Sequence, residues 1–350
     1  MISTDQLHDT LVRLPRAQLA FLPTPLHRAD GLSQLLGIDL WIKRDDLTGL
    51  ALGGNKVRKV EFLVGDALAQ GATRLLTTAA AQSNFCRVVA AAARRAQLGV
   101  RLLLRGSPEE PIQGNLLLDR LMDAEIRFTS DMDPYSLATQ EQLERWADEE
   151  RATGGSPYLI HIHHGSRAGA LATVGYVNAT IELDRQCREW GVQPQHLYVA
   201  VGSGSTLAGL ALGVEMVDGA LEECQLHGIC VSAAASVVRD KIEEFLTSCS
   251  SLLDLPASSP RFLLDDSQRG DGYGIPTPAA IEAIRLVART EALFLNPVYT
   301  GKAFAALISD IERGVISAGE TVIFLNTGGE PLLFAHADQF AQSVEQCQSS

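Results

Sequence analysis

The sequence alternates short apolar segments with longer amphipathic ones, and this alternation limits the possible folds more than any other feature. The first half contains, in order, Asp39–Lys43, Lys56–Leu68, Arg74–Thr78, Ser83–Gln97, Val100–Leu104 and Asn115–Met122. The second half repeats the pattern with Tyr158–Ile162, Leu197–Val201, the apolar run Val231–Val238 and Thr321–Asn326. Strands that alternate with helical segments predict an α/β fold with parallel strands and crossover helices.

The length of the chain predicts two lobes rather than one small core. A chain of 350 residues exceeds the size at which a single core usually stops growing. The only small-residue cluster near the middle, Gly154–Ser156, is too short to be a flexible linker. We therefore expect two open, twisted, mainly parallel α/β lobes that share a cleft. The predicted large domain comprises residues 1–56 and 165–350, and the small domain comprises residues 57–164.

Charge and composition exclude several classes of protein. The chain has 42 acidic and 29 basic residues, which give a formal net charge of −13, and no basic patch interrupts this excess. Such a chain repels nucleic acid and anionic membrane surfaces. It has no 18-residue apolar run and no leader-like N-terminal segment, and its six cysteines are scattered without a CxxC pair. We expect a cytoplasmic protein with reduced thiols that binds neither nucleic acid nor membrane.

Glycine and hydroxyl residues concentrate where predicted strands end. Four such junctions are Leu52–Lys56, Ala79–Asn84, Val201–Thr206 and Asn326–Glu330. In open α/β folds, ligands bind at the carboxyl ends of the strands. The four junctions are therefore expected to face one site.

Lys56 is a candidate nucleophile. It follows Gly53-Gly54-Asn55 directly and opens a predicted helix, in a chain with only five lysines. Burial and the positive end of a helix dipole both favour the neutral amine of a lysine, which can form a Schiff base. The spacing alone fits an ordinary first-turn lysine equally well.

The run Val201–Thr206 predicts a phosphate site. Its glycines let backbone N–H groups converge, its hydroxyls add donors, and a helix is expected to begin directly after it. The run is not a P-loop, and it lacks the third glycine and the acidic partner of a dinucleotide fingerprint. A nicotinamide-dependent dehydrogenase is nevertheless an alternative, and so is a regulatory protein that binds a cofactor without turnover.

A Schiff-base lysine together with a phosphate loop points to pyridoxal 5'-phosphate. With these residues, the chain resembles the fold-type II pyridoxal-phosphate enzymes, and among them the 1-aminocyclopropane-1-carboxylate deaminase and D-cysteine desulfhydrase family. The resemblance extends in order from Pro23 to Gly329. Its matching segments are Pro23–Leu26, Ile42–Asp46, Gly53–Lys59, Gln82–Asn84, Gly114–Asn115, Gly202–Thr206, Gly272–Gly274, Pro297–Lys302 and Thr327–Gly329.

The resemblance implies a role for each matching residue. Lys56 would hold the cofactor, Asn84 would bond its phenolic oxygen, and Thr327 would approach its ring nitrogen. The phosphate would be bound by Gly202, Ser203, Gly204, Ser205 and Thr206. The implied substrate-binding residues are Ser83, Asn84, Gln82 and Thr300, and the implied catalytic residues are Lys56, Ser83, Tyr273 and Tyr299. No metal site is expected, and the resemblance implies a homodimer.

Two threonines favour one branch of the family. Ring-opening deaminases carry Glu and Leu where this chain has Thr300 and Thr327, whereas desulfhydrases carry Thr at both positions. The resemblance therefore implies α,β-elimination from a small amino acid, with D-cysteine as the leading substrate and with pyruvate, ammonia and hydrogen sulfide as products. The alternatives are 1-aminocyclopropane-1-carboxylate deamination and sulfite elimination from cysteate. The latter requires a cationic pocket residue that the sequence does not identify.

The chain also departs from the family pattern. Phe85, Asn296 and Asn326 replace the residues that related chains usually carry, and His161-Ile162-His163-His164 replaces a loop of small residues. Phe85 is expected either to pack within its helix or to narrow the pocket. A metal role for the histidines would need a third ligand, and none lies at a suitable spacing. We expect a structural or pocket-lining role for these histidines.

Overall fold

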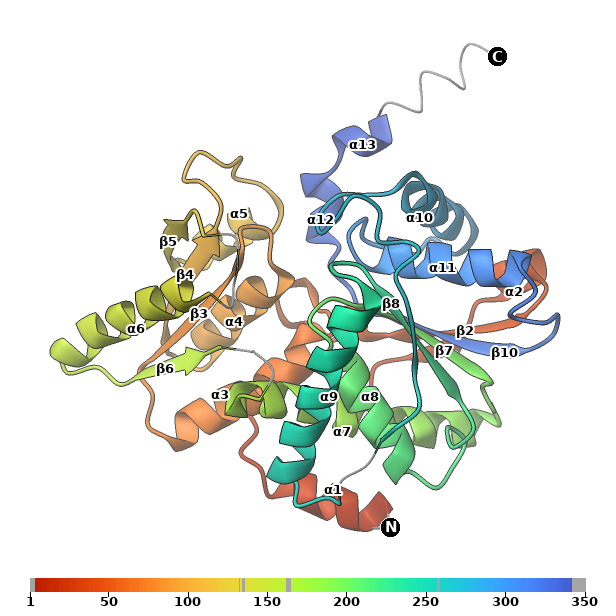
Figure 1. The fold of residues 1–350 in the computed structure, drawn as a ribbon, viewed down its shortest axis with the longest axis horizontal. Helices are drawn as coiled ribbons and strands as arrows, with labels where there is room; N and C mark the ends of the chain where they lie inside the picture. The colour runs from red at the N-terminus through yellow and green to blue at the C-terminus, as the bar shows by residue number, and fades with distance from the viewer. Residues whose placement is uncertain (1–3, 132, 134–135, 162–164, 257–258, 342–350) are drawn as a thin grey trace.

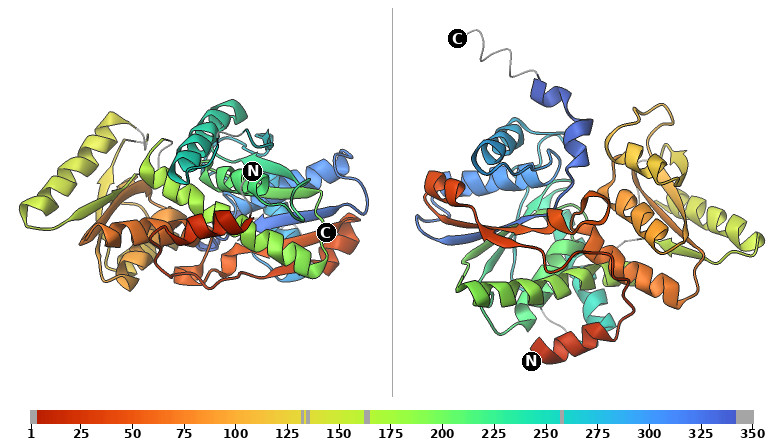
Figure 2. Two further views of the ribbon diagram at one scale, coloured as in Figure 1. Left: turned by 90° about the horizontal axis from the view of Figure 1, so that it is seen from below. Right: turned by 180° about the vertical axis from the view of Figure 1, so that it is seen from behind.

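The computed structural model describes residues 4–131, 133, 136–161, 165–256 and 259–341, which form two lobes side by side (Figure 1). Each lobe is built on its own sheet, and helices cover both sheets. The two further views in Figure 2 show the lobes joined along one flank, with α3 (Lys56–Ala69) and α7 (Arg167–Trp190) running past each other.

The larger lobe contains a six-stranded sheet with the strand order β1-β2-β10-β7-β8-β9. All neighbouring strands are parallel except β1 and β2. The bounds are β1 (Leu26–Arg28), β2 (Asp39–Arg44), β7 (His196–Val201), β8 (Gln225–Cys230), β9 (Leu263–Asp265) and β10 (Thr321–Asn326). The central strands β7 and β10 are almost wholly buried and apolar, as expected for a parallel sheet covered on both faces.

Helices cover both faces of this sheet (Figure 1). One face carries α2 (Asp30–Leu36), α10 (Pro278–Glu291) and α11 (Thr300–Glu312), which pack on a buried apolar cluster that includes Phe304 and Phe324. The other face carries α7, α8 (Ser205–Met216) and α9 (Ala235–Leu252). The remaining elements of this part of the chain are α1 (Thr4–Val12), η1 (Asp45–Leu47), η2 (Leu50–Leu52), α12 (Pro331–Ala335) and α13 (Asp338–Ala341).

The smaller lobe contains a parallel four-stranded sheet with the order β5-β4-β3-β6. Its strands are β3 (Arg74–Ala80), β4 (Gly99–Arg105), β5 (Glu125–Thr129) and β6 (Pro157–Ile160), and its helices are α4 (Asn84–Arg95), α5 (Gly114–Leu121) and α6 (Leu137–Ala152). The buried Trp146 and Leu143 of α6 pack against Leu76 and Leu103 of the sheet.

One apolar core extends through both lobes. It includes Leu75 of β3 and Val88 of α4 in the smaller lobe, and Leu171 and Leu207 in the larger lobe. Helix α7 approaches α3 closely at Gly175, where a Cβ atom would lie 2.5 Å from the backbone oxygen of Arg58. The lobes are therefore packed together and are not joined by a tether.

The structure confirms the α/β fold with parallel sheets and shows what the apolar run Val231–Val238 forms. The expected strand Thr321–Asn326 is β10, and most other elements agree within a few residues. The apolar run Val231–Val238 is not a strand, because the strand β8 ends at Cys230 and the helix α9 begins at Ala235. The strand β8 was not expected from the sequence, because its polar residues, such as Gln225 and His227, interrupt the apolar pattern.

Two further expectations concern the chain as a whole. The proposed domain limits, 1–56 with 165–350 and 57–164, stay a prediction. In the described part of the chain, no helix is both long and apolar enough to cross a lipid bilayer.

Candidate active site

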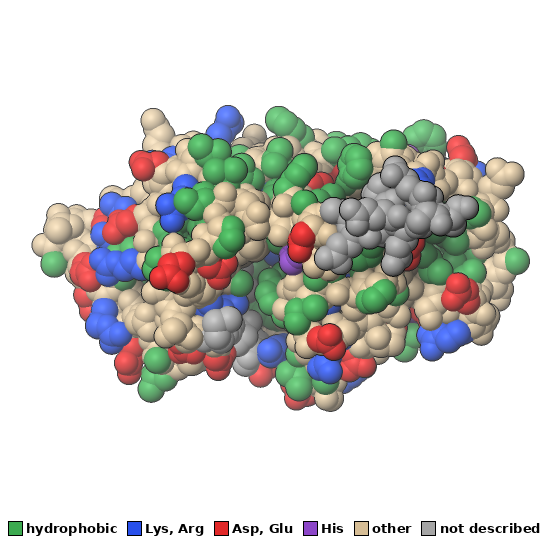
Figure 3. All heavy atoms as spheres, turned by 90° about the horizontal axis from the view of Figure 1, so that it is seen from above, with side chains coloured by type: hydrophobic (Ala, Val, Ile, Leu, Met, Phe, Trp, Pro, Cys, Tyr) green, Lys and Arg blue, Asp and Glu red, His purple; other side chains and the backbone are tan. Residues whose placement is uncertain are grey.

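A pocket of about 690 Å³ lies between the lobes, at the carboxyl ends of strands from both sheets. Its lining includes the ends of β3, β4 and β7 and the residues that follow β6, β8 and β10. Figure 3 shows the molecular surface hollowed between the two lobes. Because parallel strands end at the same edge of a sheet, loops far apart in the sequence meet in this pocket.

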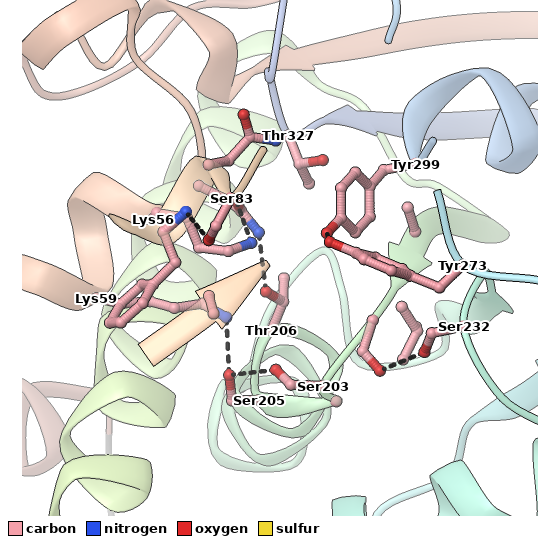
Figure 4. A pocket seen from close by; sticks show the side chains of 18 of the residues that line it. Lys56, Lys59, Ser83, Ser203, Ser205, Thr206, Ser232, Tyr273, Tyr299 and Thr327 are labelled. Atoms are coloured by element: carbon pink, nitrogen blue, oxygen red, sulfur yellow. Dashed lines mark hydrogen bonds between the residues drawn. The ribbon is translucent and has the colours of Figure 1, made fainter. Parts of the chain in front are cut away.

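Lys56 lies inside the pocket at the first turn of α3. Its Nζ donates to Oδ1 of Asn55 at 2.9 Å and lies 5.8 Å from the centre of the Tyr299 ring (Figure 4). Burial lowers the pKa of Lys56 to about 8, and the nearby charge of Arg87 adds to this effect. A far larger fraction of this amine than of an ordinary lysine amine is therefore neutral, and thus nucleophilic, near neutral pH.

Lys59 lies one helical turn further along α3 and reaches the same pocket. Its Nζ donates to Oγ of Ser205 at 2.8 Å. Burial lowers the pKa of Lys59 well below its ordinary value, and the charge of Lys56 adds to this effect. A dianion bound beside Ser205 would restore the charged form of Lys59.

The loop Gly202–Thr206 forms a hydroxyl-rich wall beside Lys59 (Figure 4). Gly204 has φ +103°, and a Cβ atom there would lie 2.8 Å from Cγ1 of Ile242. The following helix α8 has no side-chain cap, so its first N–H groups are available to an anion. Oγ1 of Thr206 accepts a bond from Nδ2 of Asn55 at 3.0 Å, which ties the loop to the Lys56 turn.

The start of α4 presents Ser83 and Asn84 to the pocket. Ser83 caps the helix, since its Oγ accepts from the backbone N–H groups of Phe85 and Cys86 at 3.1 and 3.2 Å. Oδ1 of Asn84 accepts from Nδ2 of Asn115 at 2.9 Å. This bond orients Asn84 so that its Nδ2 is left to donate.

Tyr273 and Tyr299 form a hydroxyl pair on the wall opposite Ser83 (Figure 4). Their hydroxyl oxygens lie 2.7 Å apart, and the rings meet edge to face. Burial raises the pKa of Tyr299 well above its ordinary value, so its hydroxyl keeps its proton at neutral pH. The pair can therefore donate a hydrogen bond into the pocket.

The Thr327 loop closes the pocket beside Lys56. The backbone oxygen of Thr327 accepts from the N–H of Asn55 at 2.9 Å, and a Cβ atom on Gly54 would lie 3.1 Å from that same oxygen. Only a glycine, with φ +109°, lets the two loops approach this closely. Thr327 thus lines the same pocket as Lys56.

The structure brings together most of the sequence-predicted site residues. Those that line the pocket are Lys56, Ser83, Asn84, Gly202, Ser203, Gly204, Ser205, Thr206, Tyr273, Tyr299 and Thr327. Two others lie outside the lining. Gln82 bonds instead to Asn115 and to the backbone of Gln113, and Thr300 is buried at the start of α11, where its Oγ1 accepts from Asn296 N–H.

The next positions to place are Phe85 and the histidines, at which the chain departs from the family pattern. Phe85 lines the pocket, and so does His161, which follows the end of β6. His163 and His164 lie outside the described residues. Within the described ranges, no group of three or more His, Cys, Asp or Glu side chains could hold a metal ion.

The sequence interpretation missed several pocket residues, and the polar or charged ones include Asn55, Lys59, Arg105 and Lys241. One signal could have found Lys59, because residues three apart share a helix face with Lys56. Nothing in the local sequence around Arg105 or Lys241 indicates the pocket.

These residues fit pyridoxal phosphate. A half-buried lysine amine faces an uncapped helix N-terminus with three hydroxyls and a second lysine, and an amide donor and a threonine hydroxyl lie nearby. The glycines of the cradle leave room that a Cβ atom would fill: at Gly202 this atom would lie 3.3 Å from the Tyr299 ring. The phosphate of the cofactor would meet the Gly202–Thr206 loop, its carbonyl carbon would meet the amine of Lys56, and its phenolic oxygen would meet the amide of Asn84.

Comparisons with known proteins agree with this chemistry. A family model described as "Pyridoxal-phosphate dependent enzyme" matches residues 17–328. The chain is 39% identical to a D-cysteine desulfhydrase of Salmonella schwarzengrund (strain CVM19633) over 336 residues, which cover 93% of this chain and 97% of the relative.

Solved structures extend the comparison. A crystal structure described as that of the ACC deaminase homologue superimposes with a TM-score of 0.85 at 35% identity, covering 96% of this chain and 98% of that one. Diaminopropionate ammonia lyase of Escherichia coli in its apo form shares the fold, with a TM-score of 0.65 at 15% identity over 97% of this chain and 90% of that one. The chain therefore belongs to the family of pyridoxal-phosphate-dependent enzymes, in its fold-type II group.

Proposed function

We propose that this enzyme catalyses α,β-elimination from D-cysteine, releasing pyruvate, ammonia and hydrogen sulfide. The observation that carries the proposal is the position of the Lys56 amine. It lies in one pocket with the loop Gly202–Thr206, which can bind an anion, and with the hydroxyl pair of Tyr273 and Tyr299. The D-cysteine desulfhydrase to which the chain is 39% identical supports the choice of substrate.

Lys56 is the residue that holds the cofactor in this proposal. The phosphate would be held by the N–H groups and hydroxyls of Gly202–Thr206, with Lys59 as a counter-charge. Asn84 would donate to the phenolic oxygen, because its own oxygen is already used by Asn115. Thr327 would meet the ring nitrogen with a neutral hydroxyl. When bound, the cofactor supplies an electron-withdrawing ring that stabilises negative charge at the substrate Cα.

The substrate is oriented by the start of α4. The hydroxyl of Ser83 accepts two backbone bonds, so its proton is free to be donated to the substrate carboxylate. The amine of Lys56 would take the Cα proton as the general base. Its lowered pKa, about 8, suits a base that works near neutral pH.

The leaving sulfur departs toward Tyr273 and Tyr299. The C–S bond breaks with its electron pair on sulfur, which leaves as hydrosulfide, and a tyrosine hydroxyl stabilises the departing sulfur. Hydrolysis of the remaining unsaturated amine by water yields pyruvate and ammonia. A phenol that keeps its proton at neutral pH can donate a hydrogen bond to that sulfur.

Ring-opening deamination of 1-aminocyclopropane-1-carboxylate is the second candidate, and the resemblance to the ACC deaminase homologue supports it. Thr327 argues against it, since a neutral hydroxyl does not support the protonated ring nitrogen that ring opening calls for. Thr300 adds less to the choice, because it lies outside the pocket lining.

The test of cofactor binding uses absorbance and labelling. The holoenzyme should absorb at about 410–420 nm, and borohydride reduction should fix the cofactor on Lys56 in a peptide map. The Lys56→Ala variant should lose the band while keeping its folded circular dichroism spectrum. A label on another lysine, or an absorbance typical of a nicotinamide, would refute the assignment.

The test of the reaction is a substrate panel. D-cysteine should yield pyruvate and sulfide, and L-cysteine, cysteate and 1-aminocyclopropane-1-carboxylate serve as comparisons. Formation of 2-oxobutanoate from the cyclopropane acid alone would favour the second candidate. A coloured protein that turns over none of these amino acids would point to a regulatory role.

We also infer a homodimer in the cytoplasm. Leu121 of α5 and Phe334 of α12 are each 72% exposed, and α5 and α12 are neighbouring helices, which supports an apolar contact with a second copy. Sedimentation that gives a monomer at working concentration would refute the dimer. The five described cysteines are free thiols, which supports a reducing compartment.

A further inference from the structure

Tyr273 lies on a loop that is not anchored by its own side chains. Residues 266–277 connect β9 to α10 without a helix or strand, and each of them is exposed or half-buried. Three glycines of this loop, Gly270, Gly272 and Gly274, have positive φ angles of +64°, +146° and +82°. Tyr273 itself is 41% exposed. Packing alone does not hold a tyrosine hydroxyl in one position on a loop of this composition and exposure.

Tyr299, the partner of Tyr273, is held by its own part of the chain. It is the residue before α11, it is half-buried, and its backbone N–H donates to Oδ1 of Asn296 at 2.7 Å. The two tyrosine hydroxyls point toward one another, with their oxygens 2.7 Å apart (Figure 4). The distance between these oxygens therefore depends on what fixes the loop 266–277 relative to the start of α11.

Lys302 makes that connection. It lies in the first turn of α11, one helical turn beyond Tyr299, and it is fully buried. Its Nζ donates to the backbone oxygen of Arg269 at 2.7 Å and to that of Gly272 at 3.2 Å. Among the described residues, the tyrosine pair is the one other hydrogen bond that joins residues 269–275 to a different element. One side chain of α11 thus fixes the backbone that carries the second tyrosine.

The chemistry of this contact indicates a role beyond packing. A buried ammonium loses its hydration, and no carboxylate in the described ranges of the chain lies within ion-pair distance of Nζ of Lys302. The carboxylate of Asp271, in the same loop, acts on this charge from further away. A methionine has nearly the same length and would fill the space without burying a charge. Lys302 therefore contributes directed bonds to the loop rather than stability.

We propose that Lys302 is a positioning residue for the elimination, because it holds the loop of Tyr273 so that this hydroxyl meets that of Tyr299 beside the departing sulfur. The inference rests on the proposed function, in which the hydroxyl pair stabilises the leaving group. Lys302 itself lies outside the pocket lining. It touches neither the substrate nor the cofactor, and it acts on the reaction through the position of Tyr273.

The first test asks whether Lys302 holds the loop. The shorter of its two bonds is accepted by the backbone oxygen of Arg269, so the peptide bond that trypsin would cut lies at this contact. In the holoenzyme, Lys302→Met should speed trypsin cleavage after Arg269 by at least about 10-fold, because the loop opens more often. Mass spectrometry of the fragments identifies the bond that is cut. Cleavage after Arg261, an exposed residue before β9, is the internal control and should keep its rate.

A second variant keeps this test informative if Lys302→Met does not fold. Tyr273→Phe removes one hydroxyl from an exposed loop and leaves Lys302 in place. Its cleavage after Arg269 should stay within about 2-fold of wild type, because the loop remains bonded to α11. Cleavage in Tyr273→Phe that is at least about 10-fold faster than in wild type would mean that the tyrosine pair, and not Lys302, holds the loop.

The second test measures turnover with two leaving groups. Lys302→Met should lower kcat for D-cysteine by about 10- to 100-fold and change KM by less than about 3-fold, because one hydroxyl is displaced while Ser83 and Lys56 keep their places. The loss of kcat for β-chloro-D-alanine should stay below about 3-fold, since chloride is a weak base that leaves without a hydrogen-bond donor. Arg313→Met is the matched control, since Arg313 pairs with Asp310 at the exposed end of α11. It should leave turnover of both substrates unchanged.

A double-mutant cycle separates positioning from a general effect. In the Tyr273→Phe background, Lys302→Met should lower kcat for D-cysteine by less than a further factor of about 3, because the hydroxyl on which Lys302 acts is already absent.

Three results would overturn the inference. They are full additivity of the two substitutions, an equal loss of kcat for D-cysteine and β-chloro-D-alanine in Lys302→Met, and unchanged cleavage after Arg269 in that variant. Trypsin cleavage does not depend on turnover, so it tests the role of Lys302 even if D-cysteine is not a substrate. Failure of the inference would leave the Lys56 label and wild-type turnover as they are, so it is distinguishable from failure of the proposed function.

Discussion

At the scale of single residues, the site depends on a buried arginine behind the cofactor lysine. Arg87 is fully buried, and its Nη2 donates to the backbone oxygen of Gly53 at 2.9 Å. Its Nε and Nη1 have no partner among the described residues. The positive charge, held this close to the Lys56 turn, is the second cause, after burial, of the lowered pKa of Lys56.

We expect Arg87→Met to raise the pKa of Lys56 above about 8. Removal of a nearby positive charge stabilises the ammonium form, so a smaller fraction of the amine is neutral at a given pH. The rate at which cofactor-free protein attaches pyridoxal phosphate, followed by absorbance from pH 6.5 to 9.5, should then reach its midpoint at higher pH. Arg87→Lys should keep the wild-type midpoint, and Arg95→Met, on the exposed end of α4, is the control. An unchanged midpoint in Arg87→Met would contradict the role of its charge.

At the scale of elements, a buried ionic cluster joins β2, α3 and α7. Arg58 of α3 donates to Asp45 and to Glu182 of α7, both at 2.8 Å, and Lys43 of β2 also donates to Glu182. Tyr176 of α7 donates to Asp45 at 2.5 Å. The helix that begins with Lys56 is therefore fixed to the larger lobe two residues beyond the lysine.

Glu182→Gln should destabilise the protein by about 2–4 kcal/mol at pH 7, because it leaves Arg58 and Lys43 with an incomplete counter-charge. Burial alone would raise the pKa of Glu182, but bonds from Arg58 and the charges of Arg58 and Lys43 lower it below its ordinary value. A lowered pKa contributes stability above the unfolded-state value that is lost as the pH falls through the folded-state value. Urea unfolding should therefore show the difference from wild type shrinking below about pH 4.5.

A second glutamate on the same helix is the matched control for this experiment. Glu189 of α7 is exposed, and the one ion pair it makes with the described residues is with Arg185, one turn away. Glu189→Gln should change stability by less than about 0.5 kcal/mol. An equal decrease in the free energy of unfolding for Glu182→Gln and Glu189→Gln would show that the ionic cluster does not hold the lobes together.

At the scale of the whole molecule, one apolar core passes through both lobes, and the cysteines report on it. Cys86 lies in the smaller lobe, whereas Cys187, Cys224, Cys230 and Cys249 lie in the larger one, and all five are buried free thiols. Burial raises the pKa of each thiol, to about 12 for Cys187 and Cys230. These thiols are therefore inert in the folded protein.

In a Cys347→Ser background, we expect none of the five thiols to react with an aromatic disulfide reagent at pH 8 until the chain unfolds. As urea is raised, all five should become reactive in one transition, because the continuous core couples the lobes. Mass spectrometry of the modified peptides separates Cys86 from the other four. Modification of Cys86 at lower urea would mean that the smaller lobe unfolds independently.

The sequence by itself determined the α/β fold class, several of the strands and helices, and the loops of the site. The strand Thr321–Asn326 and the helix that starts at Lys56 could be predicted because apolar periodicity is a local property of the chain. The glycine and hydroxyl loop Gly202–Thr206 could be predicted for the same reason, since the left-handed backbone at Gly204 favours glycine and that glycine is visible in the local sequence. The strand β8 could not, because Gln225 and His227 break its apolar pattern.

Only the tertiary structure decided which side chains meet in the pocket. Gln82 and Thr300 belong to the right loops but are bonded away from the pocket, whereas Arg105 and Lys241 enter it from segments without any motif. The physical reason is that the direction of a side chain depends on the phase of its strand or helix and on what packs beside it. An isolated stretch of sequence does not contain that information, because the other residues that line the pocket with Arg105 and Lys241 are far away along the chain.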